Sequence, residues 1–293
     1  MIDTKLTGKT ALITGANNPY GIGAAIAKAL SEQGAKVFLQ YYRMNFPPVS
    51  QKNYEVEKFG EEFYHSQLAK NCDEVLDSIT GNGGEAYAIE KDLSDSINIP
   101  VILDEAEKAF GKVDILINNA AYWQADTFIP PKDKPVNELV ELWSGRPDTI
   151  SAESFDRLIA VNTRAPVLLM KEFASRYVNK DLKSGRIINI STDGSYCFPS
   201  EISYGAGKFA LESYTRSAAA ELGKYGITVN ALSLGPVQTG WITPELEKQV
   251  LPDIPIGRIG TPEDVADAVV FLVSEQAGWI TGQRIFIGGG HSM

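Results

Sequence analysis

Two residues four positions apart carry side chains that can move a proton together. The segment Ser203–Lys208 has the pattern of the start of a long helix, and it contains Tyr204 and Lys208. Residues at this spacing lie on one face of a helix, one turn apart. An ammonium beside a phenol favours the phenolate, because a nearby opposite charge stabilises the charged form. We therefore expect Tyr204 to exchange a proton closer to neutral pH than its usual pKa of about 10 allows, although such pairs also occur on helix surfaces without chemistry.

A strand-like segment that ends in two hydroxyls precedes this helix. Residues Arg186–Ile190 are strand-like, and Ser191 and Thr192 follow directly. These hydroxyls make the Tyr204 and Lys208 pair informative, because polar side chains at a strand end directly precede the helix that carries the pair.

A glycine-rich loop near the start of the chain predicts a phosphate site. The apolar run Thr10–Thr14 suits a buried parallel strand, and it leads into Gly15, Gly21 and Gly23. A helical pattern and a second strand at Val37–Leu39 complete a βαβ unit. Glycines let the backbone approach a pyrophosphate, and the helix N-terminus offers it free N–H groups. The alternative is a tight strand-to-helix turn without a ligand.

The end of the second strand bears on the choice of cofactor. It reads Gln40–Arg43 and carries no Asp or Glu, the residues that hold the ribose hydroxyls of NAD. A basic residue here suits the 2′-phosphate of NADP, so Arg43 favours NADP(H) over NAD(H). The alternative is that Arg43 is a solvated loop residue.

Strand and helix patterns alternate along the whole chain. We predict one α/β domain over residues 1–293, a doubly wound Rossmann-type parallel sheet of about seven strands with helices on both faces. We predict insertions at the irregular stretches 44–64 and 122–149, and the second is too long for an ordinary connection. The predicted strands are 10–14, 37–39, 86–89, 113–117, 186–190, 227–232 and 284–287, and the predicted helices include 22–30, 68–79, 101–110, 154–177, 204–222, 245–251 and 262–274.

Polar side chains interrupt two of these elements. The strand at 113–117 ends in Asn118 and Asn119, whose side chains can tie neighbouring strand ends together, and the alanines that follow leave room for a flat ligand. Asn162 lies inside the helix at 154–177, four residues before Pro166. Because proline removes a backbone donor, this helix can leave carbonyls free for water.

Composition excludes several classes of partner. The formal net charge of −10 argues against nucleic acid and gives no support for binding an anionic membrane. Cys72 and Cys197 form no CxxC pair, and the two histidines are far apart, so we expect free thiols and no metal site. No apolar run reaches the roughly 18 residues of a membrane span, and no signal peptide is evident. We therefore expect a cytoplasmic protein that binds neither nucleic acid nor a membrane.

The order of these motifs resembles the short-chain dehydrogenase/reductase family. The resemblance covers about residues 5–290, and the Tyr-x-x-x-Lys spacing is closest to 3-oxoacyl-carrier-protein reductases. It rests on Thr14, Gly15, Gly21, Ile22, Gly23, Asp92, Asn118, Asn119, Ala120, Asn162, Ser191, Thr192, Tyr204, Lys208, Pro236 and Thr239.

The resemblance implies a role for each matching position. Tyr204 would be the general acid in carbonyl reduction and the base in the reverse direction. Lys208 would lower the pKa of Tyr204 and hold the nicotinamide ribose. Asn162 would anchor a water in the proton relay. Asn118 would line the cofactor. The residues implied to bind the cofactor are Gly15, Asn17, Gly21, Ile22, Gly23, Tyr42, Arg43, Asp92, Leu93, Asn119, Ala120, Ala121, Tyr204, Lys208, Pro236, Val237 and Thr239.

Two departures from the family pattern leave alternatives open. The glycine loop has two extra residues within Asn17–Tyr20, so phosphate contacts do not transfer one for one. Counting along the strand puts Thr192 where the family has its catalytic serine, whereas counting back thirteen residues from Tyr204 gives Ser191. We favour Thr192, because a loop loses a residue more easily than a strand shifts its register.

The resemblance also frames the function. It implies transfer of a hydride between NADP(H) or NAD(H) and a carbonyl or secondary alcohol, with 3-oxoacyl thioesters among the candidate substrates, by a homotetramer or homodimer. An enoyl-thioester reductase is the near alternative, but those relatives separate Tyr and Lys by six residues, and Glu201 occupies that position here. A non-catalytic cofactor-binding protein on the same fold is the second alternative.

Overall fold

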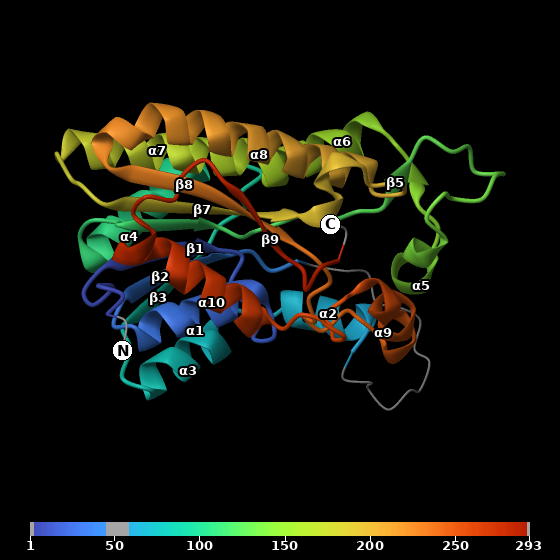
Figure 1. Ribbon diagram of the computed structural model, residues 1–293, viewed down its shortest axis with the longest axis horizontal. Helices are drawn as coiled ribbons and strands as arrows, with labels where there is room; N and C mark the ends of the chain where they lie inside the picture. Colours follow the sequence, from blue (N-terminus) through green and yellow to red (C-terminus); the bar gives the residue numbers. More distant parts are fainter. Residues whose placement is uncertain (1–2, 45–58, 292–293) are drawn as a thin grey trace.

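The protein, described here as a computed structural model of residues 3–44 and 59–291, is built on a seven-stranded sheet (Figure 1). All neighbouring strands pair in parallel, in the order β3-β2-β1-β4-β7-β8-β9. This arrangement confirms the predicted Rossmann-type sheet of seven strands. The strands are β1 (Thr10–Thr14), β2 (Lys36–Tyr41), β3 (Ala86–Glu90), β4 (Ile115–Asn118), β7 (Gly185–Thr192), β8 (Ile227–Leu234) and β9 (Arg284–Ile287).

Helices cover both faces of the sheet, as Figure 1 shows. Side chains alternate between the faces along each strand, so Ile188 and Ile190 pack in one core cluster and Ile187 in the other. One face holds α1 (Ile22–Glu32), α3 (Asp73–Gly81) and α10 (Pro262–Val273). The opposite face holds α4 (Asn98–Phe110), α7 (Ala165–Asn179) and α8 (Ile202–Leu222).

The winding of the sheet reverses beside β1. This strand pairs with β2 on one side and with β4 on the other. The loops that leave the carboxyl ends of β1 and β4 therefore diverge to opposite faces, and ligands of open α/β sheets bind in the crevice formed there. The glycine loop follows β1, and Asn119 follows β4, so the fold brings the two predicted motifs to one edge.

The two predicted insertions contain structure that the sequence did not reveal. Residues 45–58 of the first insertion lie outside the described part of the chain, but its end forms α2 (Glu61–Leu68). The next helix starts at Asp73, not at Leu68 as predicted. The second insertion holds a two-stranded parallel sheet of β5 (Asp126–Thr127) and β6 (Asp148–Thr149), with the short 3-10 segment Glu138–Val140 and α5 (Glu141–Ser144) between them.

The elements outside the central layers gather at one end. Figure 1 places α2 and α5 near α9 (Pro244–Val250), on the side toward which the parallel strands point. The predicted helix over 154–177 is divided into α6 (Ala152–Ile159), a π-helical segment (Ala160–Arg164) and α7. Within residues 3–44 and 59–291, no helix has the length and apolar character needed to cross a membrane.

Candidate active site

One face of α8 carries a row of titratable side chains. Glu201 is the N-cap residue of this helix, and Tyr204, Lys208 and Glu212 follow at intervals of three and four residues, so their side chains share one side. Lys208 is 1% exposed, and its Nζ donates a 2.9 Å hydrogen bond to the carbonyl oxygen of Ile190. The predicted pairing of Tyr204 and Lys208 on one helix face is confirmed.

The pKa of Tyr204 is raised, not lowered as we expected from the nearby lysine. Burial of the phenol is the main cause, and negative charge on Glu201, Tyr64 and Asp193 adds to it. Burial lowers the pKa of Lys208 to about 8, although Glu212 opposes this shift. The expectation failed because the local pattern does not reveal how deeply the phenol is buried, and because Tyr64 and Asp193 approach the ring from other segments.

The two candidate hydroxyls point to different surroundings. Ser191 is 3% exposed and donates a 2.6 Å hydrogen bond to Glu212 Oε1, beneath α8. The less buried Thr192 ends β7, and its Oγ1 accepts a 3.4 Å hydrogen bond from the Gly194 amide. Ser191 is therefore committed to a buried contact, and this geometry favours Thr192 as the hydroxyl that meets a substrate.

The Asn162 side chain holds the chain that leaves β4. It lies in the π-helical segment and is fully buried. Its Nδ2 donates to the Tyr122 carbonyl at 2.6 Å, and its Oδ1 accepts from the Tyr122 amide at 3.1 Å. The helix widens where this polar residue sits, which is a common form of helix distortion at functional sites.

Glycines shape the loop after β1 as a cradle that fits a pyrophosphate. Gly15 has φ +69°, and a Cβ there would lie 2.7 Å from the Ala120 Cα. A Cβ on Gly23 would lie 2.5 Å from the Gly15 carbonyl oxygen. Gly21 is the N-cap residue of α1 and has no side chain to bond its first N–H groups. These groups and the helix dipole are suited to an anion at the switch point of the sheet.

The extra residues of the glycine loop bond to the protein itself. Asn17 is 3% exposed, and its Nδ2 donates to the carbonyls of Leu68 at 3.0 Å and Lys70 at 2.8 Å. Asn18 Nδ2 donates to the Thr239 carbonyl at 3.1 Å. Both bonds use the side-chain Nδ2 of Asn17. This nitrogen is therefore engaged within the protein and does not support the predicted contact of Asn17 with a cofactor.

Helix α2 connects this loop to the segment after β8. The Gly60 amide donates to the Gly240 carbonyl at 2.9 Å. The rings of Phe63 and Tyr20 meet edge to face with centroids 5.3 Å apart. We call these contacts, together with the Asn18–Thr239 bond, the clasp.

The predicted adenine-side residues lie at the ends of β2 and β3. Arg43 binds Glu90 through both Nε at 2.9 Å and Nη2 at 2.7 Å, which lowers the pKa of the Glu90 carboxyl. Tyr42 is exposed beside it. Asp92 accepts from the Ser94 amide at 2.8 Å, whereas Leu93 is buried in the core. Arg43 is therefore neither a free basic group nor a simple solvated loop residue.

The paired asparagines tie strand ends together, as predicted. Asn118 Nδ2 donates to Asn189 Oδ1 at 2.7 Å, which joins β4 to β7. Asn119 Nδ2 donates to the carbonyls of Thr14 at 2.8 Å and Gly15 at 2.9 Å, which joins β4 to the glycine loop. Asn118 is 2% exposed, so it supports the crevice from within the sheet and does not line it as expected.

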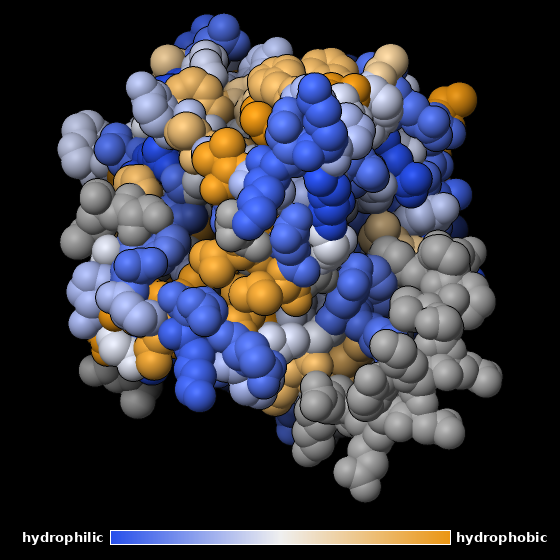
Figure 2. All heavy atoms as spheres, turned by 90° about the vertical axis from the view of Figure 1, so that its right-hand side faces the viewer, coloured by the Kyte–Doolittle hydropathy of each residue, from blue (hydrophilic) through white to orange (hydrophobic). Residues whose placement is uncertain are grey.

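The remaining predicted residues border the same end. Ala120 packs against Gly15, and Ala121 is exposed. Val237 is buried and forms an isolated bridge with Gly260 in the segment after β8, which also contains Pro236 and Thr239. Figure 2 looks onto this end of the molecule, where apolar side chains gather near the middle of the face and polar side chains surround them.

Sequence reasoning missed two acidic residues near Tyr204 and Lys208. Glu201 is 4% exposed, burial raises its pKa to about 7, and its Oε2 accepts a 2.5 Å hydrogen bond from Trp123 Nε1. Glu212 is 1% exposed and accepts from Ser191. The helical spacing from Tyr204 and Lys208 would have indicated both, because residues three and four apart share a face.

Comparison with known proteins agrees with this architecture. A family model described as enoyl-(acyl carrier protein) reductase matches residues 54–292. The uncharacterized oxidoreductase YjdA of Bacillus subtilis is 34% identical, over 96% of this chain and 96% of that protein. The NADPH-dependent aldehyde reductase 2 of Arabidopsis thaliana chloroplasts is 33% identical, over 97% of this chain and 94% of that protein. The 3-oxoacyl-[acyl-carrier-protein] reductase FabG of Staphylococcus aureus is 30% identical, over 97% of this chain and 98% of that protein.

Two solved structures extend the likeness to three dimensions. A short-chain dehydrogenase/reductase from Serratia marcescens superposes with a TM-score of 0.76 at 29% identity, over 98% of this chain and 99% of that one. The angucycline C-6 ketoreductase LanV with bound NADP gives a TM-score of 0.75 at 30% identity, over 98% of this chain and 96% of that one. Fold, motif order and relatives lead to one conclusion: the chain belongs to the short-chain dehydrogenase/reductase family and is an oxidoreductase.

Proposed function

We propose that this protein reduces a carbonyl group, or oxidises the corresponding secondary alcohol, with NADP(H) as the favoured cofactor and Tyr204 as the proton-transfer residue. The observation that carries the proposal is the position of Tyr204 and Lys208 on α8, beside the end of β7 and at the edge that also holds the glycine cradle. Family membership supports hydride-transfer chemistry, and the names of several relatives support NADP.

Each residue has a definite task in this proposal. The Tyr204 hydroxyl gives its proton to the substrate oxygen during reduction and takes one back in the reverse direction. The Thr192 hydroxyl donates a hydrogen bond to the same oxygen and so orients the carbonyl. Lys208 lies one helical turn beyond the tyrosine and would hold the nicotinamide ribose. Asn162 fixes the Tyr122 backbone on one side of the site.

The cofactor would lie across the crevice beside β1. Gly15, Gly21 and Gly23 would hold its pyrophosphate, and Arg43 would meet the adenine ribose and its 2′-phosphate. Asn119 ties the end of β4 to the glycine loop, and Thr239 would border the nicotinamide side. When bound, the nicotinamide supplies or accepts the hydride.

The names of relatives support a carbonyl substrate. They describe an aldehyde reductase, a 3-oxoacyl-[acyl-carrier-protein] reductase and an angucycline C-6 ketoreductase, each of which reduces a carbonyl group. Enoyl-thioester reduction is less well supported despite the description of the family model, since Tyr204 and Lys208 lie one helical turn apart. We further propose a homotetramer or homodimer in the cytoplasm, which rests on family likeness.

Cofactor titration tests the proposal first. Purified protein is titrated with NADPH and with NADH while nicotinamide fluorescence is followed, and aldehydes, ketones and 3-oxoacyl thioesters are then screened with the preferred cofactor. We expect tighter binding of NADPH and reduction of at least one carbonyl class. Absence of binding by both cofactors would overturn the proposal in favour of a non-catalytic protein on this fold.

A further inference from the structure

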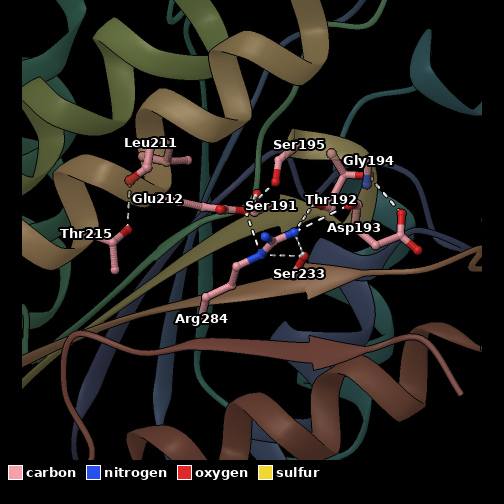
Figure 3. Close-up of polar contacts among 10 residues, drawn as sticks. All are labelled: Ser191, Thr192, Asp193, Gly194, Ser195, Leu211, Glu212, Thr215, Ser233 and Arg284. Atoms are coloured by element: carbon pink, nitrogen blue, oxygen red, sulfur yellow. Dashed lines mark hydrogen bonds and ion pairs between the residues drawn. The ribbon is translucent and has the colours of Figure 1, made fainter. Parts of the chain in front are cut away.

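A buried carboxylate connects the catalytic helix to the strand that carries the hydroxyls. Glu212 Oε1 accepts hydrogen bonds from Ser191 Oγ at 2.6 Å and Ser195 Oγ at 2.8 Å. The Arg284 Nε lies 3.2 Å from the same oxygen. Figure 3 shows these groups converging from α8, the end of β7 and β9. Glu212 is 1% exposed, so its charge depends on these partners.

The guanidinium of Arg284 continues the network across the sheet. Its Nε and Nη2 contact Ser233 Oγ on β8 at 3.1 and 3.0 Å. Its Nη2 also donates to the carbonyls of Asp193 at 3.3 Å and Thr192 at 3.5 Å. One arginine on β9 therefore holds the backbone of the segment that follows β7, as drawn in Figure 3.

These contacts restrain the short segment 191–195 from both sides. Ser191 and Ser195 are held through their hydroxyls by Glu212, and the carbonyls of Thr192 and Asp193 are held by Arg284. Thr192 lies between them, and among the described residues its own hydroxyl makes two long hydrogen bonds, accepting from the Gly194 amide at 3.4 Å and donating to Asp193 Oδ1 at 3.5 Å. The network fixes the backbone of Thr192 and leaves its hydroxyl available.

We propose that Glu212 and Arg284 are positioning residues that hold Thr192 in place for the reaction. This inference rests on the proposed function, in which Thr192 orients the substrate carbonyl. Glu212 lies one helical turn beyond Lys208 on the same side of α8. The pair of Glu212 and Arg284 therefore also fixes the distance between β7, which ends in the hydroxyls, and α8, which carries Tyr204.

A purely stabilising role does not account for this arrangement. Glu212 Oε2 has no hydrogen-bond partner among the described residues, and apolar side chains of similar volume stabilise a buried site as well as an ion pair does. The charges are instead directed at hydroxyls and carbonyls of one five-residue segment. Such bonds define a backbone position more sharply than apolar packing, since they depend on direction.

The test uses Glu212→Gln and Arg284→Lys, each alone and combined with Thr192→Ala. Glu212→Gln keeps the shape of the side chain but removes its charge, and Arg284→Lys keeps the charge but loses the forked geometry. Arg176→Lys is the matched control, because Arg176 is similarly buried (19% against 21% side-chain exposure) and also makes several ion pairs, with Asp104, Glu107 and Glu172, on α4 and α7.

We expect each single substitution to slow single-turnover hydride transfer about tenfold, with the cofactor dissociation constant changed less than about twofold. In the Thr192→Ala background the same substitutions should have little further effect, because residues that act through one group are not additive. Arg176→Lys should leave the rate unchanged. An equal loss in both backgrounds, or no loss in folded variants, would overturn the proposal.

Amide hydrogen exchange gives a second readout that needs no activity. The amides of residues 193–196 should exchange faster in Glu212→Gln and Arg284→Lys, whereas the amides of α1 should not change. Unchanged exchange would show that the pair does not hold this segment. If the unmodified protein binds no nicotinamide cofactor, the proposed function fails, and the exchange result still decides whether Glu212 and Arg284 position Thr192.

Discussion

The Nζ of Lys208 lies 5.7 Å from the centre of the Tyr204 ring. The ammonium is held by the Ile190 carbonyl at the carboxyl end of the sheet, one helical turn beyond the tyrosine. The two groups therefore lie side by side on one face of α8, with the lysine ammonium near the tyrosine ring. This relationship leads to the first two predictions.

Removing the Tyr204 hydroxyl should stop the reaction and spare the fold. Tyr204→Phe keeps the ring that packs near Phe198 but has no proton to give. We expect turnover to fall about 100-fold to 10,000-fold, with cofactor affinity within about twofold of the unmodified protein. Steady-state kinetics and nicotinamide fluorescence measure the two effects, and turnover comparable to that of the unmodified protein would exclude Tyr204 as the proton-transfer residue.

Removing the charge of Lys208 should stabilise the fold near neutral pH. Burial lowers its folded-state pKa to about 8, against about 10.4 in the unfolded chain, so the lysine opposes folding below pH 8. The penalty is relieved as pH rises from about 8 to about 10.4, where only the unfolded state remains protonated. Lys208→Met should therefore gain on the order of 2 kcal/mol in unfolding free energy at pH 7 and much less above pH 10, while losing activity.

Urea denaturation at pH 7 and at pH 10 checks this prediction. Lys171→Met provides the control, because that side chain is 71% exposed and should give no such pH-dependent difference. A gain in stability that is equal at both pH values would mean that the effect comes from packing and not from the buried charge.

Neutralising Glu90 should increase the preference for NADPH. Its carboxylate occupies two donors of Arg43 and places negative charge where a 2′-phosphate would approach. In Glu90→Gln, we expect the affinity for NADPH to rise about threefold relative to the affinity for NADH. In Arg43→Met, we expect the same ratio to fall about tenfold. Fluorescence titration at low and high salt measures both, and parallel changes for the two cofactors would contradict this assignment.

Removing the Asn17 side chain should loosen the glycine loop. Asn17→Ala leaves the carbonyls of Leu68 and Lys70 without this donor, at a cost of about 1–3 kcal/mol in unfolding free energy. Asn82→Ala is the matched control, because Asn82 bonds the Ser78 carbonyl at an exposed site and should cost less than about 0.5 kcal/mol. Equal losses in the two variants by urea denaturation would refute a special role for Asn17.

Local patterns were enough to predict the sheet and the residues at its edge. Apolar runs such as Leu12 and Ile13 are buried on both faces of a parallel sheet, so their pattern is strong. The side-chain hydrogen bonds of Asn118 and Asn119 to neighbouring strand ends could be predicted because both residues stand at the end of a strand. Alternation along β7 also explains the hydroxyls, since Ser191 shares its face with Asn189, which faces Thr215 on α8.

The remaining features depend on contacts between distant segments. The groups that raise the pKa of Tyr204 include Asp193, which follows β7, and Tyr64 from α2. The pairing of Arg43 with Glu90 joins residues 47 positions apart. No local pattern places such partners, because their approach is decided by the packing of whole elements.

The clasp joins the glycine loop to the segment after β8, because Asn18 is bonded to Thr239 and both segments contact α2 or its N-cap. In the proposed function, Asn18 would lie on the phosphate side of the cofactor and Thr239 on the nicotinamide side. Opening either loop must break bonds of the other, so both would open in one cooperative event. A molecule that orders one loop would then strengthen binding at the other by the same factor in both directions, which links the affinities of cofactor and substrate without any contact between them.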